Sequence, residues 1–139
     1  MIYSAIILLI AAAIYCHKRD WKENLRTGRV NHSRALKWKI LTCILPVILF
    51  TIHKTGWPLL INWSTVLAGG KSILLTGAWF LFLFNGLWGW RAQHDPFYRS
   101  TAIGKNLSRL DRLVLHWPKG LYIFFIVVLL IGATLIYFL

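Results

Sequence analysis

The charged residues of this chain are bunched, and the stretches between the bunches are long and strongly apolar. Four such stretches contain no Asp, Glu, Lys or Arg: residues 1–16, 40–52, 72–90 and 120–139. A helix needs about 20 apolar residues to cross a hydrocarbon core of ~30 Å. The pattern therefore predicts an all-α, polytopic integral membrane protein. Its four transmembrane helices are expected at approximately residues 2–16, 38–53, 72–90 and 121–139.

The composition agrees with a membrane protein and excludes several other classes. Hydrophobic residues make up 58% of the 139 residues and charged residues 14%, whereas soluble domains average about 25% charged residues. The apolar excess excludes a disordered chain and argues against a soluble, basic nucleic-acid-binding domain. Two cysteines are too few for a disulfide framework. Because positive charge follows the first apolar run, we expect a retained anchor, not a cleaved signal peptide.

The basic residues predict how the chain is oriented in its membrane. Eight Lys and Arg lie between residues 17 and 39, and six lie between 91 and 119, but the second connection holds only Lys54 and Lys71. Basic loops stay in the cytoplasm. We therefore expect cytoplasmic loops at 17–37 and 91–120 and both termini outside. A bacterial inner membrane, or an internal membrane of a virion, is the expected location.

The segment between the second and third spans is the main ambiguity. Residues 54–71 are predicted to be an interfacial segment on the outer face, with Trp57 and Trp63 at headgroup depth. Two alternatives for residues 57–68 stay open, a re-entrant piece and a fifth span. A fifth span would place the two basic loops on opposite faces and discard their charge asymmetry.

Residues 104–117 have an amphipathic pattern that predicts a short interfacial helix. Leu107, Leu110 and Leu113 recur at helical spacing on one face, with basic residues on another. Anionic lipid is the expected partner of the basic residues. An acidic protein or a nucleic acid is the alternative partner. For a nucleic acid, the basic residues would contact phosphates and the interleaved tryptophans would stack on bases. The candidate contact residues are Lys18, Arg19, Lys22, Arg26, Arg29, Arg34, Lys37, Lys39, Lys105, Arg109 and Arg112.

Four residues in the apolar runs are candidates for helix packing: Pro46, Gly77, Gly86 and Gly89. Proline removes a backbone hydrogen bond and bends a helix. Glycines let two membrane helices approach closely. Trp79 lies well inside the third span, so its indole N–H is expected to need a hydrogen-bond partner.

The sequence predicts no catalytic or metal-binding site. No Asp, Glu, Lys, Arg or His falls inside the four apolar runs, although such groups mark proton and ion pathways. The five histidines form no pair suited to a haem or a metal. We therefore expect no cofactor and no metal. The one arrangement that could support a lipid-active enzyme is His94, Asp95, Asp111 and His116.

These features favour a non-catalytic role. The expected function is that of a small subunit or scaffold in a larger membrane assembly, partnered by other membrane subunits or by copies of itself. Two alternatives stay open. One is a membrane immunity or superinfection-exclusion protein that acts alone, and the other is the lipid-active enzyme.

Overall fold

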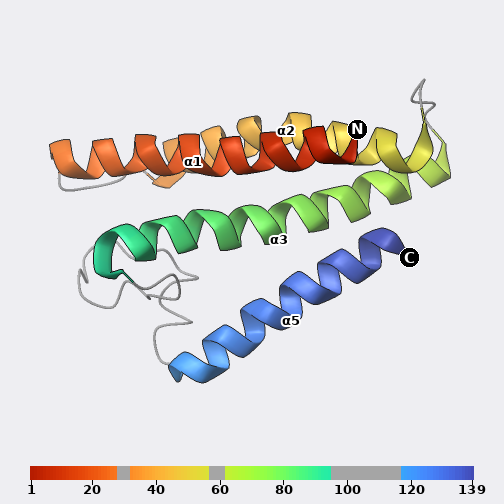
Figure 1. The fold of residues 1–139 in the computed structure, drawn as a ribbon. Coiled ribbons are helices and arrows are strands. Elements are labelled where there is room, and N and C mark those ends of the chain that lie inside the picture. The colour runs from red at the N-terminus through yellow and green to blue at the C-terminus, as the bar shows by residue number, and fades with distance from the viewer. Residues whose placement is uncertain (28–31, 57–61, 95–116) are drawn as a thin grey trace.

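The computed structural model describes residues 1–27, 32–56, 62–94 and 117–139, and its ordered elements there are four helices (Figure 1). They are α1 (Ile2–Thr27), α2 (His32–Thr55), α3 (Trp63–Gln93) and α5 (Lys119–Phe138). Each is long and apolar enough to cross a membrane. The predicted all-helical class with four such helices is confirmed. Residues 104–116 of the expected interfacial helix lie outside the described residues.

Successive helices run in opposite directions, so the chain has two distinct ends (Figure 1). Both termini and the step from α2 to α3 lie at one end. The end of α1, the start of α2, the end of α3 and the start of α5 lie at the other, which we call the basic end. Helices α1, α2 and α3 all pack against one another, while α5 packs against α3 and diverges from it toward its own N-terminus.

Helix boundaries follow local capping residues, not the positions of charges. Asn62 caps α3, because its Oδ1 accepts a hydrogen bond from the Thr65 backbone N–H at 2.9 Å. Gly56 ends α2 at φ +79°, a left-handed conformation that glycine adopts without steric cost. His94 ends α3 in the same region, at φ 57°, and its N–H donates to the Trp90 carbonyl at 2.8 Å.

Two segments that were predicted to lie outside the helical spans are helical in the structure. Residues 63–71 were expected in an outer interfacial segment, but they form the first turns of α3. Residues 63–68 are therefore neither a separate fifth span nor a re-entrant piece, while 57–61 lie outside the described residues. Residues 17–27 were expected in a loop, but they continue α1. Lys, Arg and Glu are good helix formers, so a charge cluster alone does not end a helix.

The core lies between α1, α2 and α3 and uses small residues on α1. Ala5, Leu9, Ala12, Ala13 and Cys16 form a buried stripe at helical spacing. Larger side chains fill the space opposite, including Phe50, Leu75, Phe80 and Phe84. Small residues allow close helix approach, which van der Waals contact then stabilises even in lipid.

Three side-chain hydrogen bonds attach α5 to the other helices, and one of them runs from Lys54 Nζ to the Phe138 carbonyl at 3.1 Å. The Trp79 indole N–H donates to Thr134 Oγ1 at 3.1 Å, so the expected partner for this indole is confirmed. The Tyr137 hydroxyl donates to the Phe50 carbonyl of α2 at 2.9 Å, and Tyr137 is fully buried. All three contacts lie toward the C-terminal end of α5, which is the end nearer to α3.

The four predicted packing residues have different environments. Pro46 lies inside the uninterrupted α2 and is fully buried. Gly89 is buried and Gly86 is half-buried. Gly77 makes no close helix contact within the described part of this chain, because a Cβ added there would meet no atom within 4 Å. The neighbouring Thr76 and Ala78 are the buried residues at this level of α3.

Candidate functional site

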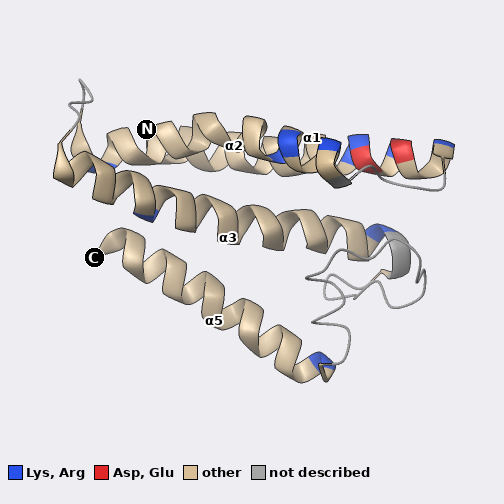
Figure 2. Cartoon of the chain, turned by 180° about the vertical axis from the view of Figure 1, so that it is seen from behind, with Lys and Arg blue, Asp and Glu red and all other residues tan. Residues whose placement is uncertain are grey.

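Lysine and arginine residues gather at the basic end of the helices (Figure 2). The helix order explains this, because the termini of four helices that flank the charged connections meet there. Five predicted contact residues are exposed on α1 and α2: Lys18, Lys22, Arg26, Arg34 and Lys37. Of the described Lys and Arg residues, only Lys54 and Lys71 belong to the opposite part of the molecule. Arg29, Lys105, Arg109 and Arg112 lie outside the described residues.

Two predicted surface cations are held instead in contacts between helices. Lys39 Nζ lies 3.2 Å from Asp20 Oδ2 and 3.7 Å from the centre of the Phe84 ring. The Arg19 guanidinium lies 5.1 Å from the centre of the Trp38 ring. Lys39 faces α1 and α3 because it lies on the inner side of α2, which corrects its expected exposure to lipid.

A polar cluster at this end comprises the buried His17 and Asp20 together with Lys39, whose side chain is 25% exposed. His17 and Asp20 are 5% and 2% exposed. The Asp20–Lys39 contact is an ion pair without a well-aligned hydrogen bond to Oδ2. A buried ion pair needs good geometry to offset the cost of removing both charges from water. The cluster therefore sets the relative position of α1 and α2, and it is expected to add little to the free energy of unfolding.

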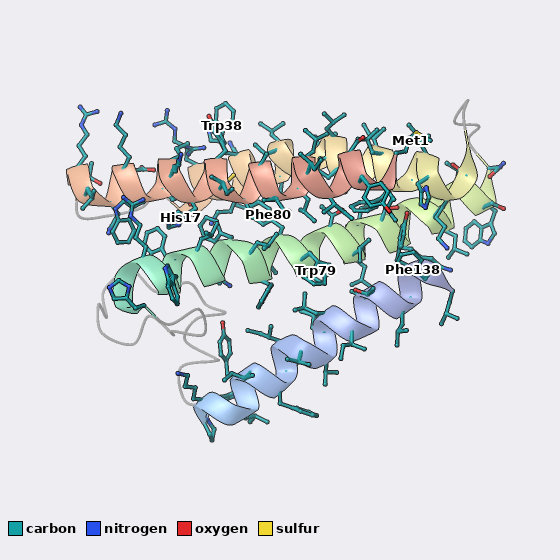
Figure 3. The ribbon with its side chains drawn as sticks, viewed as in Figure 1. Met1, His17, Trp38, Trp79, Phe80 and Phe138 are labelled. Carbon is teal, nitrogen blue, oxygen red and sulfur yellow. The ribbon has the colours of Figure 1, made fainter. Side chains whose placement is uncertain are left out.

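Aromatic rings enclose this polar cluster on the side of α3. His17 lies between α1 and α3 (Figure 3), with ring centres 5.8 Å from Trp88 and 6.3 Å from Phe84. Trp21 and Trp88 pack edge to face at 5.2 Å, and the Arg91 guanidinium lies 4.8 Å from the Trp21 ring. Such cation–aromatic contacts contribute about 0.5–2 kcal/mol each, depending on how dry they are.

The sequence pattern did not identify His17 and Asp20 as buried residues, although a signal was present. Both positions continue the stripe of Leu9, Ala12, Ala13 and Cys16 at helical spacing. The charged residues of 17–27 predict a loop, and this expectation obscures the helical spacing of buried residues beyond Cys16. Continuing the spacing through the charges would have placed Asp20 on the inner face.

The described part of the chain gives little support for metal chemistry. No three His, Cys, Asp or Glu side chains in it come close enough to share a metal ion. Of the four residues considered for a lipid-active enzyme, His94 caps the end of α3, with its ring 6.0 Å from Trp90. Asp95, Asp111 and His116 lie outside the described residues.

Comparisons with known proteins identify no relative. No protein-family model, no curated protein and no solved structure matches this chain.

Proposed function

We propose that this protein is a small, non-catalytic subunit or scaffold of a larger membrane assembly, and that α5 is its docking helix. The observation that carries the proposal is the unequal packing of the four helices. In the most apolar 18-residue stretch of each helix, 33% is buried in α1 and in α3, but only 11% is buried in α5. Helix α5 is thus attached along one side and leaves most of its surface for a neighbouring helix.

The exposed face of α5 is apolar and continuous. Phe124, Val128, Ile131 and Leu135 recur along it at helical spacing, and all four are exposed. Membrane helices associate through van der Waals packing along such faces. A second membrane chain, or another copy of this one, would bury them.

We place the basic end in the cytoplasm, with both termini outside, in a bacterial inner membrane or an internal membrane of a virion. Both charged connections leave the helices at the same end, which supports this orientation under the positive-inside rule. The exposed cations of α1 and α2 flank apolar helices, a position in which they attract anionic lipid at about 1 kcal/mol each.

Purification in a mild detergent, followed by mass spectrometry of the retained chains, tests the docking role. We expect the wild-type protein to retain a second membrane chain or to form a defined oligomer. The double substitution Val128→Trp/Ile131→Trp changes the shape of the exposed α5 face and is expected to remove at least nine-tenths of the retained partner, about a tenfold loss of affinity.

The matched control is Ile44→Trp/Ile48→Trp, which enlarges two exposed apolar residues on α2. It is expected to retain the partner at the wild-type level. A wild-type protein that is monomeric and retains no other chain would contradict the subunit proposal and favour an immunity or exclusion protein that acts alone. Equal loss in both variants would contradict the assignment of docking to α5.

A further inference from the structure

An open cavity of about 490 Å³ lies at the end opposite the basic end. The end of α2, the first turns of α3 and the end of α5 form its walls. Its polar lining includes Lys54 of α2 and Ser64, Thr65 and Lys71 of α3. Lys54 and Lys71 are the two lysines that the positive-inside pattern leaves away from the basic end, and both line this one cavity.

The Lys54 ammonium is held in place by α5. Its Nζ donates to the Phe138 carbonyl at 3.1 Å and lies 5.2 Å from the centre of the Tyr137 ring. Tyr137 is itself fixed by its hydrogen bond to Phe50. The Lys54 ammonium therefore contacts α5, while its side chain remains exposed to solvent.

Lys71 reaches the same cavity from α3. Ser64, Leu67, Ala68 and Lys71 are spaced at three and four residues, so they share one face of that helix. Lys71 lies two turns inside an apolar helix, where a charged side chain is costly unless it is paired or reaches the interface. Two cations from separate helices thus face one concave site.

No acidic side chain of the described residues lies at this end to balance them. Asp20 and Glu23 belong to α1 at the basic end (Figure 2). Two lysines in one cavity repel each other, and a bound anion would reverse that effect. The charge of the cavity therefore fits an anionic ligand.

The surroundings of the cavity favour an anion that carries an apolar tail. Leu67 and Ala68 line it beside the lysines, and Trp63 at its edge is 79% exposed. The cavity lies where the helices end, the depth at which tryptophan and lipid headgroups meet. We propose that it binds the phosphate headgroup of an anionic phospholipid, with the acyl chains along α3. This site is independent of the docking role proposed for α5.

Native mass spectrometry of the detergent-solubilised full chain tests the proposal. The chain carries a C-terminal tag, so that Leu139, which lines the cavity, does not place a terminal carboxylate beside the two lysines. The probes are phosphatidylglycerol, phosphatidylcholine with the same acyl chains, and inorganic phosphate. We expect one phosphatidylglycerol to be retained, and neither of the other two. Lys54→Met/Lys71→Met is expected to weaken that retention about tenfold or more, because two charge-assisted contacts are lost.

Two control variants separate the site from general charge effects. Arg91→Met/Lys119→Met removes the same charge at the basic end, at residues outside the candidate lipid contacts of α1 and α2, and should leave the retained lipid unchanged. Lys54→Arg/Lys71→Arg keeps both cations and should retain it. If the double Met variant loses helical circular dichroism, Lys71→Met alone is used, because Lys71 is half-exposed. Retention unchanged in the folded Met variant, or inorganic phosphate retained as well as the lipid, would overturn the proposal.

Discussion

Asp20 is a buried carboxylate whose charge is balanced from another helix. Its carboxylate is 3% exposed and lies 3.2 Å from the ammonium of Lys39. Removing one member of a buried ion pair leaves the other charge without compensation, which costs more than the pair contributes when intact. The contact therefore acts mainly to select one arrangement of α1 against α2.

Asp20→Ala is expected to lower the free energy of unfolding by about 1–2 kcal/mol, because it removes the partner of Lys39, whose side chain is 25% exposed. The double variant Asp20→Ala/Lys39→Met should recover most of that loss, since it leaves no buried charge unpaired. Unfolding by denaturing detergent, followed by circular dichroism, measures both values. Lys22→Met on the exposed face of α1 is the control and should change little. A double variant no more stable than Asp20→Ala would show that the ion pair is not the cause.

Tyr137 makes one of the two hydrogen bonds that connect α5 to α2 in the described residues, the other being Lys54 to the Phe138 carbonyl. Tyr137→Phe removes the donor to the Phe50 carbonyl but keeps the buried ring. We expect a loss of about 1 kcal/mol, because hydrogen bonds between membrane helices contribute modestly. Tyr3→Phe, at an exposed tyrosine of α1, should be neutral. The same unfolding experiment compares them, and equal stability of the two variants would contradict the prediction.

At the scale of the elements, α3 packs through Ser72, Thr76 and Ala78, which are buried, and not through Gly77. Glycine in a helix interior has more conformational freedom to lose than alanine. Because a Cβ at Gly77 meets open space, an added methyl group there creates no clash. The glycines of α3 therefore do not all pack against a neighbouring helix.

Gly77→Ala is expected to raise the free energy of unfolding by about 0.5–1 kcal/mol. Ala13→Leu, at a fully buried position of α1, should instead lower it by about 1–3 kcal/mol through overpacking. Thermal unfolding in detergent distinguishes the two signs. A destabilised Gly77→Ala would mean that this glycine does contact a neighbouring helix.

At the scale of the whole molecule, the antiparallel order of the helices places both charged connections at one end. Any membrane orientation must then put Lys22 and Lys119 on one side, and Tyr3 and Ser64 on the other. The positive-inside rule assigns the first pair to the cytoplasm.

Single cysteines at these four positions, in a Cys16→Ala/Cys43→Ala background, test this topology. A membrane-impermeant maleimide added to intact cells is expected to label positions 3 and 64, and to label 22 and 119 only after the membrane is opened. Labelling of 22 and 119 from opposite sides would contradict the arrangement of the helices. Labelling of both from outside would reverse the proposed orientation.

The helix content, the presence of four apolar helices and the partner requirement of Trp79 followed from the sequence alone. These properties depend on local composition, since an uncharged run of sufficient length has few alternatives in lipid. The helix boundaries were harder to predict. Asn62 begins α3 through a side-chain hydrogen bond and His94 ends it through its backbone conformation, and neither contributes to the apolar pattern, whereas charge clusters are tolerated inside a helix.

Only the tertiary structure decided which residues face each other. His17 and Asp20 are buried, Lys39 pairs with Asp20, and Lys54 and Lys71 line one cavity. Each of these arrangements depends on contacts between different helices. Apolar periodicity identifies the buried face of one helix, but it carries no information on which helix covers that face. That choice depends on shape and charge complementarity between helices, which exists only once they are packed together.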